Sequence, residues 1–372
     1  MASPVEHQPG HRPPRVGLVL GAGGVLGGAW LTGGLQALAE ETGWDPGSAE
    51  QIVGTSAGAM VGALVAAGVP PWFMVAHSAG ESFAGLAGPD GRPAAEADRS
   101  AGAVFRVQRG LPPLGPGSVR MALTTLARPM RHTPLQVITG WLPQGVLATD
   151  SLEETIGRVV ARGWVGHPGF WAVTCDYDSG KRVPFGRLDA PRADLAKAVA
   201  ASCAIPGFYR PVRIGARRYV DGGVCSASNL DLLKGLGLDL VICLNPTSSR
   251  HRSDSRSPLA RLVGMSRAAS GRRLGYEAKK VRATGTSVVL IQPTARDHEV
   301  MGNNLMSTRR RHEVIERAME TVREQLAAPA VRRRLAGLPP GEPHKLRRPP
   351  GPPSTWPELV PAVVRGRPRR AA

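Results

Sequence analysis

Short apolar runs alternate with segments of small residues along the first part of the chain. Residues 16–20 (VGLVL) and 51–53 (QIV) are short and mostly apolar, which is the pattern of strands buried on both faces. Residues 29–39 and 57–67 follow them, are rich in Ala, Gly and Leu, and predict buried helices. Strand, tight turn and helix, repeated in this order, indicate an α/β fold.

The same pattern continues toward the C-terminus. Helices are expected at 193–202, at 309–335 and from residue 151 to about 161, where Ser151 and Glu154 form a candidate capping box. Further strands are predicted at residues 170–175, 182–185, 217–220, 239–244 and 287–291. We therefore predict a three-layer α/β/α domain with a mainly parallel central sheet and a site at the carboxyl ends of strands.

Composition divides the chain into three parts. Residues 1–14 are polar and Pro-rich and predict a disordered tail, and residues 331–372 predict a second, basic tail rich in Pro and Arg. Residues 15–330 are expected to form the folded domain. Within it, residues from about 80 to 135 are rich in Gly, Ala, Pro and Arg, with weak periodicity. They predict an irregular or helical insertion that borders the site.

A net charge of +18 is the most unusual bulk property. It favours anionic partners such as a membrane surface, although an arginine-rich composition with basic tails explains it equally well. Residues 250–282 carry ten basic side chains and suit either a helix lying on an anionic membrane or a solvated basic face. We expect peripheral membrane contact and no specific nucleic-acid binding, since zinc-finger and RNP patterns are absent from the sequence and aromatic residues are few.

The cysteines and the N-terminus bear on location. Cys175, Cys203, Cys225 and Cys243 form no CxxC pair and have no accompanying His cluster, so reduced core thiols and a cytoplasmic protein are expected. The start of the sequence has no apolar signal region, and no uncharged apolar run reaches 18 residues. We expect no membrane-spanning segment, no metal and no organic cofactor.

The strongest chemical signal is Gly54-Thr55-Ser56-Ala57-Gly58, a G-x-S-x-G motif placed directly after a predicted strand and before a predicted helix. Such an elbow forces the serine into a strained backbone geometry, so the residues two before and two after it must be very small. The following helix points its partly positive end at the site. The motif predicts Ser56 as a nucleophile for acyl transfer.

A glycine-rich turn, Gly21-Ala22-Gly23-Gly24-Val25-Leu26-Gly27-Gly28, follows the first predicted strand. Gly23 and Gly24 can offer backbone N–H groups, unobstructed by side chains, to a carbonyl oxygen. A dinucleotide-binding fingerprint fails at strict spacing because Leu26 takes the place of its third glycine, but a looser spacing is met. A nucleotide-binding oxidoreductase and a tight turn without a ligand therefore stay open here.

The third signal is Tyr219-Val220-Asp221-Gly222-Gly223, in which an aspartate ends a strand before two glycines. In isolation this is either a simple turn or the position of a base. In their order, the three motifs resemble those of the patatin-like phospholipase family. The resemblance covers about residues 15–325 and includes residues 198–208, residues 175–180 and the strand ending Leu244-Asn245-Pro246.

This resemblance implies a Ser–Asp dyad, with Ser56 as nucleophile and Asp221 as base. It also implies an oxyanion hole from the amides of Gly23, Gly24 and Val25, and hydrolysis of lipid esters through an acyl-Ser56 intermediate. Partial burial would raise the pKa of the aspartate and make it a better base. The glycines that support the three motifs are Gly21, Gly27, Gly54, Gly58, Gly222 and Gly223.

Leu26 and His298 bear on this scheme. Many family members carry a basic residue where Leu26 stands, so the loop would lack that cation for an anionic headgroup while keeping its amides. His298 follows the last predicted strand, where the histidine of a Ser-His-Asp esterase could lie, but a polar surface loop explains it as well. A non-enzymatic protein that binds anionic surfaces, with a vestigial site, is the remaining alternative.

Overall fold

The computed structural model describes residues 12–79, 105–108, 110, 115–127, 133–249 and 258–339. Residues 1–11 of the predicted N-terminal tail and most of the predicted C-terminal tail lie outside these residues. Much of the predicted insertion at 80–135 does so too. The described part of that insertion contains two helices, α5 (Val119–Ala127) and α6 (Pro134–Trp141), of which α6 extends past residue 135.

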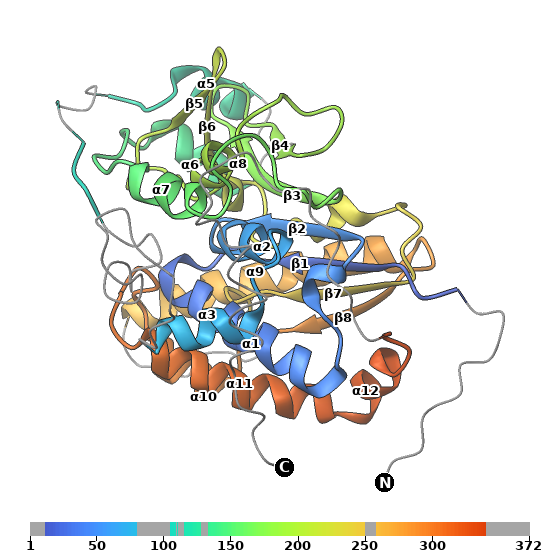
Figure 1. The fold of residues 1–372 in the computed structure, drawn as a ribbon. Helices are drawn as coiled ribbons and strands as arrows, with labels where there is room; N and C mark the ends of the chain where they lie inside the picture. Colours follow the sequence, from blue (N-terminus) through green and yellow to red (C-terminus); the bar gives the residue numbers. More distant parts are fainter. Residues whose placement is uncertain are drawn as a thin grey trace, which may run out of the picture.

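One sheet forms the centre of the described fold (Figure 1). Its strand order is β5-β6-β3-β2-β1-β7-β8, with β4 pairing with β3 beside this path. β3, β2, β1, β7 and β8 run parallel, whereas β4 and β6 pair antiparallel with β3, and β5 with β6. The mainly parallel sheet predicted from the sequence is confirmed. The strands are β1 Val16–Leu20, β2 Gln51–Thr55, β3 Phe170–Asp176, β4 Arg182–Phe185, β5 Val212–Ile214, β6 Arg217–Asp221, β7 Leu240–Leu244 and β8 Ser287–Ile291.

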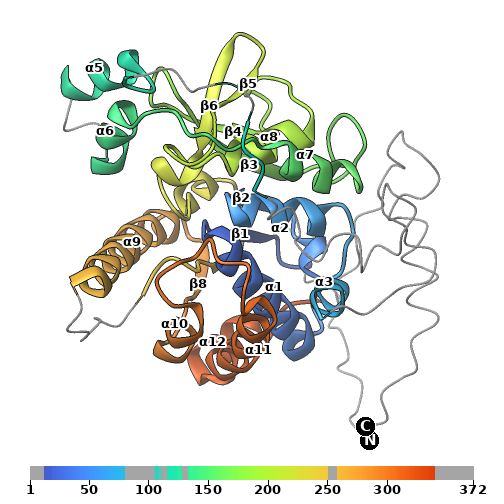
Figure 2. The same ribbon diagram turned by 90° about the vertical axis from the view of Figure 1, so that its left-hand side faces the viewer.

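Alternating side chains of the strands divide the core between the two faces of the sheet. Leu18 and Ile52 belong to the larger cluster, which also contains buried residues of α1 (Gly24–Thr42), α2 (Ala57–Ala66), α8 (Leu195–Ser202) and α11 (Arg311–Ala327). Val19 and Val53 belong to a second cluster, with Leu274, Ala278 and Val281 of α9 (Pro258–Arg282). Figure 2 shows α9 on one side of the sheet and α1, α2 and α11 on the other. The predicted three-layer arrangement is confirmed.

Shorter helices complete the described chain. Among the described residues, no single helix is long and apolar enough to span a membrane. Ala57–Ala66 and Pro71–Ala79 reach that length and apolarity only when taken together, and the chain bends by 118° between them. The four cysteines are free and buried, as predicted. The shorter helices of the described chain are η1 Pro46–Ser48, α3 Pro71–Ser78, α7 Asp150–Gly157, η3 Gly222–Val224, η4 Leu230–Leu233, α10 Ala295–Met301 and α12 Pro329–Leu335.

Two helix predictions need correction. The single helix expected at 309–335 is two helices, α11 and α12, because Pro329 lacks an N–H and the preceding Ala328 is extended (φ −58°, ψ 128°). The capping box expected at Ser151 is wrong, since α7 already begins at Asp150 and the N-cap residue is Thr149. α12 also carries the described fold past residue 330 and buries Leu335.

Candidate active site

The strands β2 and β6 both pair with β3, and they end opposite neighbouring residues of it. β2 runs parallel to β3 and pairs Thr55 with Val173, whereas β6 runs antiparallel and pairs Asp221 with Thr174. Ser56 directly follows β2, and Asp221 is the last residue of β6. The register of the sheet therefore brings residues from distant parts of the sequence to one place.

Ser56 occupies a strained turn between β2 and α2. Its backbone is left-handed in φ (φ 55°, ψ −121°), which is costly for a residue with a side chain. A Cβ added at Gly54 would overlap the carbonyl oxygen of Gly58, and one added at Gly58 would overlap that of Leu20. Only glycine fits at these two positions, and the turn is held tightly against β1.

Asp221 is buried and engaged on two sides. Its carboxylate accepts a side-chain hydrogen bond from Ser56 and a backbone hydrogen bond from the N–H of Gly223 (2.7 Å). Burial raises the pKa of Asp221 to about 6, and the two hydrogen bonds oppose this rise only in part. A carboxylate with such a pKa is ionised near neutral pH but is a stronger base than an exposed aspartate.

The glycine-rich turn between β1 and α1 presents unused backbone donors. Among the described residues, the N–H groups of Gly23, Gly24 and Val25 donate no hydrogen bond, whereas their neighbours do: Ala22 to Ala227 (2.8 Å) and Leu26 to Leu305 (2.9 Å). Gly24 has φ +60°, which turns the chain into α1. Three consecutive amides at a helix N-terminus form a suitable place for a negative oxygen.

This turn lies between the elbow and the aspartate. A Cβ added at Gly28 would lie 3.7 Å from the Cβ of Ala57, the residue after Ser56, and one added at Gly223 would lie 3.6 Å from the Cβ of Ala22. The amide donors, Ser56 and Asp221 therefore belong to one site. The structure brings together all the residues that the sequence indicated for it.

The strand end Leu244-Asn245-Pro246 fixes the glycine-rich turn from behind. A Cβ at Gly21 would overlap the Asn245 side chain, and one at Gly23 would lie 2.6 Å from Cγ of Pro246. Gly27 packs on the same proline, where an added Cβ would lie 3.2 Å from Cγ. Leu26 is buried with the core cluster, so the position that is basic in many family members faces the interior here.

The end of α8 and the residues after it hold Ser56 and Asp221 together. The Ser202 hydroxyl accepts the N–H of Ser56 (2.9 Å) and donates to the carbonyl of Val173 (2.6 Å). The Cys203 thiol donates to the carbonyl of Ser56 (3.2 Å), and the N–H of Asp221 donates to the carbonyl of Ala204 (3.0 Å). Ser202 was not singled out in the sequence; only its place in residues 198–208 pointed to it.

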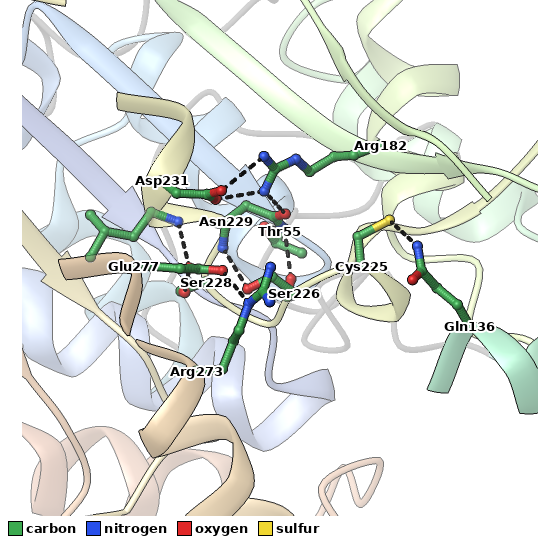
Figure 3. Close-up of polar contacts among 11 residues, drawn as sticks. Thr55, Gln136, Arg182, Cys225, Ser226, Ser228, Asn229, Asp231, Arg273 and Glu277 are labelled. Carbon is green, nitrogen blue, oxygen red and sulfur yellow. Dashed lines mark hydrogen bonds and ion pairs between the residues drawn. The ribbon is translucent and has the colours of Figure 1, made fainter. Parts of the chain in front are cut away.

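A buried polar network supports the elbow from the other side (Figure 3). Asn229 Nδ2 donates to Thr55 Oγ1 (3.0 Å) and to the carbonyl of Ser226 (2.6 Å), which links the elbow to the chain that follows Asp221. Asn229 is left-handed (φ 52°, ψ 27°), a conformation that asparagine tolerates well. It was not predicted, because its partner lies 174 residues away in the sequence.

Paired charges complete this network. Arg182 donates to Asn229 Oδ1 (3.1 Å) and to Asp231 (2.6 Å), and although burial opposes it, this guanidinium holds the pKa of Asp231 below its ordinary value. Glu277 of α9 is fully buried and accepts from Ser228 (2.5 Å), from the N–H of Leu230 (3.1 Å) and from Arg273 (2.8 Å). The loop after Asp221 is thereby fixed to α9.

His298 lies in α10, a helix begun by a capping box of Thr294 and Asp297, and not in the polar loop that the sequence suggests there. α10 packs on α11. The groups that act on the Asp221 carboxylate are Ser56 and Gly223, together with burial, and His298 is not among them.

Comparison with known proteins adds to this geometry. The family model of patatin-like phospholipases matches residues 18–234, a span that contains the glycine-rich turn, Ser56 and Asp221. The fold is similar to VipD from Legionella pneumophila (15% identity, TM-score 0.41, covering 84% of this chain and 67% of VipD). It is also similar to the type III effector protein ExoU (17% identity, TM-score 0.33, covering 87% of this chain), of whose length the chain spans 54%. Because the family model matches more than half of its residues, the chain belongs to the patatin-like phospholipase family.

Proposed function

We propose that this protein hydrolyses acyl esters of lipids, with Ser56 as nucleophile and Asp221 as its base. Family membership supports a lipid acyl hydrolase in general terms. The observation that carries the specific assignment is the hydrogen bond between Ser56 and the buried Asp221, beside the free amides of Gly23, Gly24 and Val25.

In the first half-reaction, Ser56 Oγ attacks the ester carbonyl while Asp221 accepts the hydroxyl proton. The carbonyl oxygen gains negative charge and is stabilised by the amides of Gly23, Gly24 and Val25. The C–O bond to the alcohol then breaks, and Asp221 returns its proton to the leaving oxygen. An acyl-Ser56 ester and a free alcohol result.

In the second half-reaction, a water molecule replaces the alcohol. Asp221 accepts a proton from this water as its oxygen attacks the acyl carbonyl, and the same amides bind the new oxyanion. Collapse releases the carboxylic acid and returns the proton to Ser56. No histidine is needed, because the pKa of about 6 lets Asp221 act as both base and acid near neutral pH.

Two variants and one probe test the proposal. A fluorophosphonate should label wild-type protein at Ser56, which peptide mass would locate, and Ser56→Ala should abolish both labelling and ester turnover. Asp221→Asn should lower kcat on a soluble short-chain ester by about 10²–10⁴-fold. His298→Ala serves as the comparison and should retain turnover. Wild-type rates in Asp221→Asn, or loss of turnover in His298→Ala, would contradict the dyad.

A further inference from the structure

α5 and α6 expose large apolar side chains on the surface next to the site. Figure 2 shows the two helices together at the periphery, far from α1 and α11. Their spacing (i, i+4, i+7 in α5 and i, i+3, i+6 in α6) places each set along one side of its helix. We call these residues, which are between 49% and 59% exposed, the α5–α6 apolar face: Val119, Leu123, Leu126, Leu135, Ile138 and Trp141.

The opposite sides of both helices are attached to the chain around Asp221. Thr133 Oγ1, at the N-cap of α6, donates to the carbonyl of Val224 (3.0 Å), three residues after the aspartate. Gln136 Nε2 donates to the carbonyl of Gly180 (2.8 Å) and contacts the thiol of Cys225 (3.5 Å; Figure 3). Met121 of α5 is fully buried in a cluster with Val224 and Cys225. The apolar face is therefore held at a fixed place beside the catalytic turn.

The sequence around α5 and α6 carries basic residues and no acidic ones. From residue 99 to residue 149 the sequence contains no Asp or Glu, whereas it contains six arginines. Arg120 lies within α5 and is exposed. Arg106 pairs with Glu154 (2.9 Å). An apolar face within a stretch whose charged residues are all basic matches a surface that has an apolar interior and anionic headgroups. The arginines are Arg99, Arg106, Arg109, Arg120, Arg128 and Arg131.

We propose that the α5–α6 apolar face inserts into an anionic lipid surface and so delivers membrane lipid to Ser56. This inference rests on the proposed function, because the bilayer is then both the docking partner and the source of the ester. An acidic protein would satisfy the cations equally well. A lipid surface is favoured because three leucines, a valine, an isoleucine and a tryptophan stand half-exposed beside a site for lipid esters, and burial of such side chains in a bilayer is favourable.

The binding test uses full-length protein with Ser56→Ala, so that hydrolysis cannot consume the vesicles. Co-sedimentation is measured with vesicles of pure phosphatidylcholine and with vesicles of phosphatidylcholine and phosphatidylglycerol at a ratio of about 7:3. We expect tighter binding to the second kind, weakened at least tenfold by Leu123→Asp combined with Ile138→Asp. The matched control is Leu188→Asp, an exposed leucine in the loop after β4, which should bind as the parent does.

A second measurement keeps this inference apart from the catalytic one. With Ser56 present, the double variant should lower the ratio of activity on vesicle-borne ester to activity on a soluble short-chain ester. If the double variant binds anionic vesicles as the parent does, the α5–α6 apolar face is not the docking surface. If the parent binds neither vesicle, the inference is overturned in favour of an acidic protein partner. Failure of the catalytic proposal would instead appear as turnover of the soluble ester by Ser56→Ala.

Discussion

The two strand-to-helix turns of the site have the same design but present different groups. Between β2 and α2, the residue with positive φ is Ser56, so a side chain is presented, while its own N–H is already bonded to Ser202. Between β1 and α1, the residue with positive φ is Gly24, so bare backbone is presented, and the N–H groups of Gly23, Gly24 and Val25 are free among the described residues. In the proposed mechanism, one turn offers the nucleophile and the other offers the oxyanion donors.

This difference shows that strain serves a different purpose in each turn. A serine at φ 55° is unfavourable and persists only because its surroundings fix it, which fits a reactive hydroxyl that must point away from the core. A glycine at φ +60° costs little, and its advantage is that no side chain covers the amides. Variants of each turn test this division of roles.

Gly24→Ala tests the turn between β1 and α1, whose amides are the proposed oxyanion donors. An added Cβ would lie 2.9 Å from Met306 Sδ and 3.0 Å from the carbonyl oxygen of Leu305, at a φ that alanine avoids, so the amides should move out of line. Loss of one oxyanion donor typically lowers kcat by about 10²–10³-fold, and steady-state kinetics on a soluble ester would measure it. Gly43→Ala places alanine at φ +68° in open space at the other end of α1 and should leave kcat unchanged. Equal effects of the two variants would mean that strain, and not donor geometry, matters.

Gly58→Ala tests how tightly the turn around Ser56, between β2 and α2, is held. The new methyl group would overlap the carbonyl oxygen of Leu20, so the free energy of unfolding should fall by about 1–3 kcal/mol or more. Urea denaturation would measure the change. Gly275→Ala, in open space on α9, should instead raise stability by up to about 1 kcal/mol. Unchanged stability in Gly58→Ala would show that the turn is free to move away from β1.

The pH dependence of kcat/KM should reflect only the turn between β2 and α2, because this is the turn that has a titrating partner, Asp221. Asp221 must be ionised to accept the Ser56 proton, so kcat/KM should fall about tenfold per pH unit below its pKa of about 6. Stability changes in the opposite sense. Because the folded pKa lies above the unfolded value of 3.8, the contribution of Asp221 to stability is full below that value and is lost as the pH rises through about 6. A rate profile with its midpoint near 4 would contradict a buried base.

Ser202→Ala should lower turnover less than Gly24→Ala does. It removes the acceptor of the Ser56 N–H and the donor to Val173, which loosens the elbow without removing a reacting group. We expect a loss of about 1–3 kcal/mol in unfolding free energy and a roughly tenfold lower kcat with KM retained. Ser48→Ala removes a similar hydrogen bond in η1 (2.6 Å, to Asp45) and should not affect kcat. A change in KM alone would place Ser202 in substrate binding.

The sequence predicted those parts of the fold that depend on local patterns. The apolar run at residues 16–20 is β1, and the motif around Ser56 lies between β2 and α2 as its spacing requires. The failures also have local causes. Pro329 divides a segment whose pattern predicts one continuous helix, and the capping box of Thr294 and Asp297 begins a helix where the sequence predicts a polar loop around His298.

The supporting residues of the site were beyond prediction for a different reason. Ser202 and Asn229 act on the elbow across 146 and 174 residues, and single serines and asparagines have no periodicity that marks such partners. Glu277 is buried and bonds to Ser228 and Arg273, whereas the sequence around it is typical of a solvated basic helix. Only the register of the sheet and the packing of α9 determine these contacts.

The close approach of Gly58 to the carbonyl oxygens of Leu20 and Gly21 has a consequence for engineering this protein. The proposed nucleophile and the proposed donors are held against each other, so libraries that randomise these glycines should yield mostly inactive clones. Diversity in acyl-chain or headgroup preference is better sought in α5, α6 and the residues around them, which adjoin the site without being wedged between its strands.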